Sequence, residues 1–265
     1  MSNGTGPVAL VTGAGAGIGR ACVFALSESG FTVVANDIDA DACDKTVALA
    51  GDAGGSARAA VFDVSDEDSW RSTVLEVLRD LGPIAVLVNN AALKASTEPG
   101  DGGVLDMLLP TWDRILTVNL RGPMLGARAV LPSMLERGHG SIVMMSSISS
   151  VRSVPGLATA YTVAKAGLDG LTRTIAVTYG PGGIRCNALA PGLILADDMP
   201  PGPSSTSLSG QGLIREDGRT ADVASVVSFL ASDRSKFING QTILVDGGIS
   251  ANLAGVTSRN RAGDT

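Results

Sequence analysis

The sequence predicts an α/β protein built on one doubly wound sheet of about seven parallel strands with helices on both faces. Short apolar runs alternate with longer amphipathic stretches along most of the 265 residues. The apolar runs show no polar–apolar alternation, as expected of strands that are buried on both faces. The first run leads into a glycine-rich turn. Repeated β–α units of this kind, joined by right-handed crossovers, form a single sheet.

The expected elements follow one another with a regular rhythm. Apolar runs predict strands at 7–12, 32–36, 59–62, 84–89, 141–146, 184–190 and 242–246. A helix is expected near 18–29, and a later one begins after Ser65, a residue type that is favoured at helix N-caps.

One stretch, 193–212, is rich in Pro, Gly and Ser and breaks this rhythm. A loop that closes over a substrate is favoured there over an inert loop or an interdomain linker. We therefore expect one domain over 1–250, with a substrate loop at about 193–218. The tail at 251–265 has no clear period and is expected to be partly disordered.

Composition excludes several classes of partner. The net charge of −6 and the pI near 4.8 give no basic surface for nucleic acid. Cys22, Cys43 and Cys186 lie far apart without a C-x-x-C motif, so neither a disulfide framework nor a metal site is expected. No run of about 18 apolar residues could span a membrane, and glycines interrupt the N-terminal segment that could otherwise suggest a signal peptide. A cytoplasmic protein is expected.

The segment TGAGAGIGR (12–20) places Gly13, Gly17 and Gly19 between a strand and a helix. Glycine permits a positive φ and a close approach of phosphate to the backbone, and the helix N-terminus offers free N–H groups to an anion. The spacing is G-x-x-x-G-x-G rather than the common G-x-G-x-x-G. A glycine pattern alone is weak, but its position between strand and helix favours a dinucleotide site.

Asp37 ends the second expected strand, in TVVANDID. A carboxylate there can accept hydrogen bonds from both hydroxyls of the adenosine ribose and repels a 2′-phosphate, which favours NAD over NADP. The alternative is an exposed turn aspartate. The nearest basic residue that follows is Lys45, although Arg20 could reach a phosphate, so NADP stays an alternative.

Tyr161 and Lys165 stand four residues apart in AYTVAKAG, which places both on one face of a helix. A phenol is a poor base at neutral pH, and a nearby ammonium group is expected to lower its pKa. The pair would then serve as a proton donor and acceptor. In isolation, a core tyrosine beside a surface lysine would explain the same spacing.

Taken together, the glycine turn and YTVAK resemble the short-chain dehydrogenase/reductase family over residues 7 to 248. Further marks are DV (63–64), NNAA (89–92), Asn119, MMSS (144–147), PG (191–192) and INGQTILVDGG (238–248). The resemblance implies a Rossmann-type fold and hydride transfer between nicotinamide and a secondary alcohol or ketone. Ala92 and Ala196 depart from the family pattern, in which glycine and threonine are common.

The resemblance also implies the roles of individual residues. Tyr161 would move the hydroxyl proton, Ser147 would orient the substrate oxygen, and Lys165 would bind the nicotinamide ribose. Asn119 would hold a water molecule in a proton relay. Ser147 is chosen over Ser146, Ser149 and Ser150 because it stands at the strand end. The implied cofactor contacts are Gly13, Gly17, Ile18, Gly19, Asp37, Asp63, Val64, Asn90, Tyr161, Lys165, Pro191, Gly192 and Ile194.

The expected partner is a small alcohol or ketone, and the sequence does not identify it. The pocket is expected near Leu93, Lys94, Ser149, Arg152, Leu157 and the 193–212 loop. The resemblance implies a homo-oligomer, a dimer or tetramer, paired through helices near 111–136 and 160–179. The alternatives are a catalytically silent dinucleotide sensor or scaffold, an NADP-dependent reductase, and an enzyme for epimerisation or dehydration. The four catalytic residues argue against the silent protein, and the ordinary length and the family-like C-terminal strand favour the simple oxidoreductase over epimerisation or dehydration.

Overall fold

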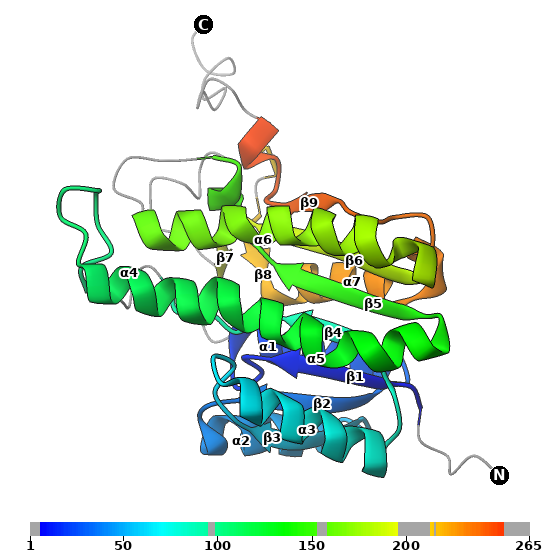
Figure 1. Cartoon of the computed structure of the whole chain (residues 1–265). Coiled ribbons are helices and arrows are strands. Elements are labelled where there is room, and N and C mark those ends of the chain that lie inside the picture. The colour runs from blue at the N-terminus through cyan, green and yellow to red at the C-terminus, as the bar shows by residue number, and fades with distance from the viewer. Residues whose placement is uncertain (1–5, 95–98, 153–157, 196–212, 215, 252–265) are drawn as a thin grey trace, which may run out of the picture.

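In the computed structural model, which describes residues 6–94, 99–152, 158–195, 213–214 and 216–251, a parallel sheet lies between two layers of helices (Figure 1). The sheet has seven strands in the order β3-β2-β1-β4-β5-β6-β9, and all their pairings are parallel. The strands are β1 (Val8–Thr12), β2 (Thr32–Asp37), β3 (Ser56–Val61), β4 (Ile84–Asn89), β5 (Gly140–Met145), β6 (Ile184–Pro191) and β9 (Thr242–Val245). The predicted doubly wound fold is confirmed.

Helices cover both faces of the sheet. One layer, nearer the viewer in Figure 1, consists of α3 (Glu67–Asp80), α5 (Gly122–Arg137) and α6 (Thr159–Tyr179). The other consists of α1 (Gly17–Glu28), α2 (Ala40–Asp52) and α7 (Thr220–Ala231). Successive strand residues serve opposite layers, since Leu10 packs in the first core and Val11 in the second. Among the described residues, no helix has the length and apolar character needed to cross a membrane.

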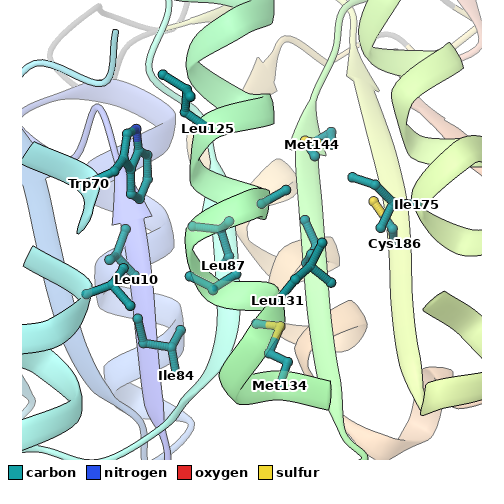
Figure 2. Packing of buried hydrophobic residues seen from close by; sticks show 14 of the residues in the cluster. Leu10, Trp70, Ile84, Leu87, Leu125, Leu131, Met134, Met144, Ile175 and Cys186 are labelled. Carbon is teal, nitrogen blue, oxygen red and sulfur yellow. The ribbon is translucent and has the colours of Figure 1, made fainter. Parts of the chain in front are cut away.

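The first core joins the sheet to α5 (Figure 2). Leu10, Leu87 and Met144, from β1, β4 and β5, are fully buried in this cluster together with Leu131 of α5. Burying such a side chain stabilises the fold by about 1.5–3 kcal/mol. The central strands are therefore firmly placed, and so are the loops that begin where these strands end.

The edge strand β3 begins three residues before the apolar run at 59–62 that predicted it. Two of these three residues, Ser56 and Arg58, are polar, as an edge strand with one neighbouring strand allows. Arg58 extends from the strand to Glu76 and Asp80 of α3, with N–O distances of 2.9 and 3.2 Å. A strand at the edge of the sheet therefore lacks the uniform apolar run that identifies the central ones.

The N-cap of α3 is Asp66 and not Ser65, so the prediction was wrong by one residue. The Asp66 carboxylate accepts the N–H groups of Asp68 and Ser69 at 3.3 and 3.2 Å. The Ser65 hydroxyl instead donates to Asp63 at 2.8 Å. Both residues are good caps by type, and the local turn decides between them.

The helix expected near 111–136 is interrupted. It consists of α4 (Leu109–Leu116), a π-helical turn η1 (Thr117–Arg121) and α5. Pro123 has no N–H group to donate to the carbonyl of Asn119, four residues earlier, and this removes an α-helical hydrogen bond. Wider π turns of this kind are common at functional sites.

The two ends of the predicted substrate loop meet in a small second sheet. In it, β7 (Ile194–Leu195) pairs in parallel with β8 (Gly218–Arg219). Residues 196–212 of the loop, with Ala196 among them, and residues 252–265 of the tail lie outside the described residues.

Candidate active site

The sequence-predicted site residues gather at the carboxyl edge of the sheet. The strand order reverses between β1 and β4, and open α/β sheets bind their ligands at such a switch point. Gly13 follows β1 and Asn90 follows β4, while Ser147 lies just beyond β5 and Pro191 ends β6. Parallel strands end at one edge, so residues far apart in the sequence come together.

The three predicted glycines of the first turn are needed for different reasons. Gly13 has a φ of 64°, and a Cβ there would lie 2.8 Å from the Cα of Ala91. Gly17 has a φ of 53° and faces open space. A Cβ on Gly19 would collide with the Gly13 carbonyl, so this glycine lets the helix pack against the turn.

The start of α1 suits an anion. Its N-cap residue, Ala16, provides no capping side chain, and its first turn holds no acidic residue. The N–H groups of this turn and the positive end of the helix dipole are therefore available to a pyrophosphate. Ile18 lies in the same turn and packs against the second core. The residues present fit a dinucleotide.

Asp37 faces the glycine turn. Its Oδ2 accepts the N–H group of Gly15 at 2.8 Å, and its Oδ1 accepts that of Asp39 at 3.1 Å. A Cβ on Gly15 would lie 2.8 Å from Asp37 Oδ2. Gly15 is therefore a site residue that the sequence analysis missed, although its place within TGAGAGIG was a signal.

Arg20 is engaged by the protein. Its Nε donates to Thr46 Oγ1 at 2.9 Å, and its Nη2 donates to the carbonyl oxygen of Gly15. The guanidinium group is therefore held against the turn by two acceptors.

Asp63 and Val64 follow the edge strand. Asp63 Oδ1 accepts both the N–H and the hydroxyl of Ser65 at 2.8 Å, which fixes the turn. Val64 is buried, and its carbonyl accepts the indole N–H of Trp70 at 2.9 Å. Trp70 in turn meets Phe62 edge to face, with ring centroids 5.0 Å apart.

Asn90 supports the glycine turn from β4. Its Nδ2 donates to the carbonyl oxygens of Thr12 and Gly13 at 2.9 and 3.1 Å. Thr12 Oγ1 accepts the N–H groups of Asn90 and Ala91, at 3.0 Å each. The Asn90 amide thus acts on the turn that would bind the cofactor.

Tyr161 and Lys165 lie one turn apart on α6, as predicted. Lys165 is buried, and its Nζ donates to the carbonyl oxygen of Met145 at 2.6 Å. This ammonium group lies 5.5 Å from the centroid of the Tyr161 ring. The hydroxyl of Ser146 donates to the backbone carbonyl of Lys165 at 3.1 Å.

The structure distinguishes the serines. Ser147 lies near enough to the Tyr161 side chain to lower the pKa of the phenol, and its Oγ lies 3.1 Å from that of Ser149. Ser146 is occupied by the α6 backbone, and the buried hydroxyl of Ser150 has no hydrogen-bond partner among the described residues. The geometry supports the choice of Ser147 and adds Ser149 as its neighbour.

The predicted lowering of the Tyr161 pKa was wrong for the protein without ligand. Burial raises the pKa of the phenol, and the hydrogen bond from Ser147 lowers it by less. The Lys165 ammonium lies over the ring and is bound to a carbonyl of β5. Burial lowers the pKa of Lys165 from 10.5 to about 8, and the nearby Asp169 carboxylate partly opposes this change.

Asn119 positions the segment after β4. Its Oδ1 accepts the N–H of Leu93 at 2.7 Å, and its Nδ2 donates to the carbonyl oxygen of the same residue at 2.9 Å. Its side chain is thereby bound to the backbone, in the π turn beside the site. The water relay that the resemblance implies stays a prediction.

The last predicted contacts follow β6. Pro191 pairs with Val245 of β9, and the N–H of Gly192 donates to the Val245 carbonyl at 3.0 Å. A Cβ on Gly192 would lie 2.9 Å from the Cα of Asp246, so the chain passes tightly there. Ile194 belongs to β7.

The expected pocket residues are only partly described. Leu93 is partly buried, Lys94 is exposed, and Leu157 lies outside the described residues. Arg152 is exposed, and its Nη2 donates to the carbonyl oxygen of Ser250 at 2.8 Å, which links the segment after β5 to the end of the described chain.

Comparisons with known proteins agree with this geometry. A family model described as enoyl-(acyl carrier protein) reductase matches residues 13–250. A probable short-chain type dehydrogenase/reductase of Bradyrhizobium diazoefficiens is 39% identical over 256 residues, which cover 96% of this chain and 90% of that protein. The 2-(R)-hydroxypropyl-CoM dehydrogenase of Xanthobacter autotrophicus is 36% identical over 92% of this chain and 98% of its own length.

A solved structure shows the same fold. The acetoin dehydrogenase of Salmonella typhimurium superposes with a TM-score of 0.85 at 30% identity and covers 96% of this chain and 100% of its own. Family model, sequence and structure agree over nearly the whole chain. The chain therefore belongs to the short-chain dehydrogenase/reductase family of oxidoreductases, whose members use nicotinamide dinucleotides.

Proposed function

We propose that this protein transfers a hydride between NAD(H) and the carbon of a secondary alcohol or ketone, with Tyr161 as the general acid and base. The observation that carries the proposal is the buried Lys165 ammonium 5.5 Å from the centroid of the Tyr161 ring, with the Ser147 hydroxyl near the phenol. A hydroxyl donor and a phenol that meet at the carboxyl edge of the sheet can both contact one substrate oxygen.

Each residue has a separate task in this proposal. Tyr161 gives a proton to the ketone oxygen or takes it from the alcohol, and Ser147 orients that oxygen. Lys165 provides positive charge 5.5 Å from the centroid of the ring. The turn with Gly13, Gly17 and Gly19 would hold the pyrophosphate, and bound NAD⁺ would supply the hydride acceptor at nicotinamide C4.

The raised pKa of Tyr161 sets an expected pH dependence. At neutral pH the phenol is protonated, which suits ketone reduction because that direction consumes a proton at the oxygen. Alcohol oxidation needs the phenolate, so its rate should rise as the pH increases above neutrality.

The preference for NAD is supported by Asp37 and Arg20. The Asp37 carboxylate, held toward the glycine turn by Gly15, would repel a 2′-phosphate. The guanidinium group that could neutralise such a phosphate is bound to Thr46 and Gly15.

The test is turnover of a panel of secondary alcohols and ketones with NAD(H) and NADP(H). Tyr161→Phe should lower kcat by about 10²–10⁴-fold, with a much smaller effect on NADH binding. Tyr179→Phe is the matched control, because the chain has only two tyrosines and this one lies at the far end of α6. Asp37→Ala should raise the ratio of NADP to NAD activity by about tenfold or more.

Three outcomes would argue against the proposal. Full activity in Tyr161→Phe would exclude the proposed acid and base. A wild-type preference for NADP would contradict the role of Asp37. Tight NADH binding without turnover of any compound in the panel would favour the dinucleotide sensor.

We also propose that two copies pair through α4, η1 and α6. A groove of about 560 Å³ on these helices is lined mainly by apolar surface, including Leu116, Leu120 and Leu171. An apolar groove on the outer face of the helices can be covered by the same surface of a second copy.

A further inference from the structure

The loop that precedes α4 is bound to the first turn of the helix that carries Tyr161. Asp101 Oδ1 accepts the N–H of Ala160 at 2.8 Å, and Asp101 Oδ2 accepts the N–H of Tyr161 at 3.2 Å. The carbonyl of Gly102 accepts both the N–H of Thr159, at 3.3 Å, and its hydroxyl, at 2.6 Å. Figure 1 shows this loop and the start of α6 at the same edge of the molecule.

These contacts provide acceptors for the N–H groups of the first three residues of α6. The first N–H groups of a helix have no acceptor within it, and a side chain at the N-cap usually provides one. The N-cap of α6 is Ala158, which has no side chain able to do so. Thr162 is the first residue whose N–H finds a helical acceptor, the Ala158 carbonyl at 3.1 Å. Asp101 and Gly102 therefore replace the missing local cap.

The loop is itself fixed at its other side. The Gly100 carbonyl accepts the N–H of Leu108 at 3.1 Å, and the Pro99 carbonyl accepts the hydroxyl of Thr111 at 2.9 Å. The carboxylate is thus held by a closed turn that joins α4. Its negative charge also lies at the positive end of the α6 dipole, which favours the contact.

We propose that Asp101 is a positioning residue for catalysis: its carboxylate fixes the first turn of α6 so that the Tyr161 hydroxyl stays in contact with Ser147. This inference rests on the proposed function of Tyr161. Tyr161 is the third residue of α6, in the turn most prone to fray without a cap. A small displacement of a catalytic group is enough to lower a rate about a hundredfold.

The proposed role predicts a particular kinetic pattern. Burial and the hydrogen bond with Ser147 set the pKa of Tyr161. Removing the Asp101 carboxylate should therefore lower kcat and, by loosening the contact with Ser147, move the pH of half-maximal rate upward. NADH binding should also change little, because the glycine turn and Asp37 lie on other elements.

The experiment compares Asp101→Ala, Asp101→Asn and Asp106→Ala in the full chain. Asp106 is an exposed acid of the same loop, so its removal changes the charge equally without uncapping α6. Hydrogen exchange of the Ala160 and Tyr161 amides, kcat against pH, and the NADH dissociation constant are measured for each. Adding Asp101→Ala to Tyr161→Phe tests whether the effect acts through the phenol.

Asp101→Ala should lower kcat by about 10–100-fold and speed exchange at both amides. Asp101→Asn keeps one acceptor oxygen and should give a smaller change in both. Asp106→Ala should match the wild type. In the Tyr161→Phe background, Asp101→Ala should cost less than about twofold, because the group that it positions is gone.

Other results would overturn the inference. Unchanged kcat in Asp101→Ala, an equal loss in Asp106→Ala, or a full additional loss in the Tyr161→Phe background would each exclude positioning. If Asp101→Ala does not fold, Asp101→Asn decides by the same criteria. Hydrogen exchange measures the contact between Asp101 and α6 independently of enzyme activity. If the wild type is inactive but Asp101→Ala still speeds exchange at Ala160 and Tyr161, the proposed function is refuted and the capping of α6 by Asp101 is not.

Discussion

Replacing Lys165 by methionine should change how the free energy of unfolding depends on pH. Burial lowers the pKa of this lysine from 10.5 to about 8 in the folded protein. Between these two values the unfolded chain binds a proton at Lys165 and the folded protein does not. The stability of the wild type should therefore rise with pH through this window, because the unfolded state binds more protons there.

The magnitude follows from the two pKa values. A fall in pKa from 10.5 to about 8 corresponds to about 3 kcal/mol, which the charged side chain costs the folded state below pH 8. Lys165 is only 3% exposed, so solvent screening reduces this cost little. Methionine has no such charge, and it also loses the hydrogen bond to Met145, worth about 1 kcal/mol. That loss is largely independent of pH, whereas the charge effect is not.

Urea unfolding at pH 7, 8, 9 and 10, followed by circular dichroism, measures the effect as a difference between variants. Relative to Lys165→Met, the wild type should gain about 2–3 kcal/mol from pH 7 to pH 10. The control is Lys45→Met, an exposed lysine whose replacement should leave the pH dependence unchanged. If the difference in free energy of unfolding between the wild type and Lys165→Met stays constant with pH, burial does not lower the pKa of Lys165.

Two further predictions concern the glycine turn and the groove. Gly15→Ala should destabilise the protein by about 1–3 kcal/mol and weaken NAD binding, because the new Cβ would lie 2.8 Å from both Asp37 Oδ2 and Ala42 Cβ. The control is Gly51→Ala, in α2, where a Cβ would have open space around it. Stability is measured by calorimetry and NADH affinity by titration, and an equal loss of both in the two variants would contradict this explanation. Leu171→Asp should shift the protein toward monomer in analytical ultracentrifugation, whereas Leu75→Asp, on an exposed position of α3, should not. A wild type that is already monomeric would refute the pairing.

The central strands could be predicted from the sequence because both their faces are buried. β4 has the predicted bounds, β1 begins one residue later than predicted, and β5 begins and ends one residue earlier than predicted. β3 was placed less well, since an edge strand tolerates polar residues such as Arg58. β7 and β8 escaped prediction because each has only two residues, and a pairing between segments over twenty residues apart leaves no local pattern.

Much of the candidate site could be predicted because its residues directly follow the predicted strands in the sequence. The glycine turn, Asp37 and Ser147 are each the continuation of an apolar run, so their meeting at one edge follows from a parallel sheet. Other features depend on tertiary contacts. Asp101 lies about sixty residues before the helix that it caps, and no local motif marks it. The direction of the Tyr161 pKa depends on how deeply the phenol is buried, which spacing on a helix does not reveal.

The end of β5 explains why Tyr161 and Lys165 can work as a unit. Three consecutive residues each face α6: the Met145 carbonyl accepts a hydrogen bond from the Lys165 ammonium, Ser146 donates to the Lys165 carbonyl, and Ser147 lies near the Tyr161 side chain. Ser146 and Ser147 lie beyond the last residue of β5, so their side chains are not bound to the alternation of the strand, and one short segment can contact both the backbone and the side chains of α6.

The first turn of α6 is therefore held from two directions. β5 fixes its inner side, and the carboxylate of Asp101 fixes the N–H groups at its start. Neither set of contacts alone determines the position of the phenol. Within the described part of the chain, the segment after β5 does not contact the N–H groups of Ala160 and Tyr161, and Asp101 does not contact the Tyr161 hydroxyl. Precise placement of a general acid requires both, since its hydrogen bond to a substrate oxygen tolerates only a few tenths of an ångström.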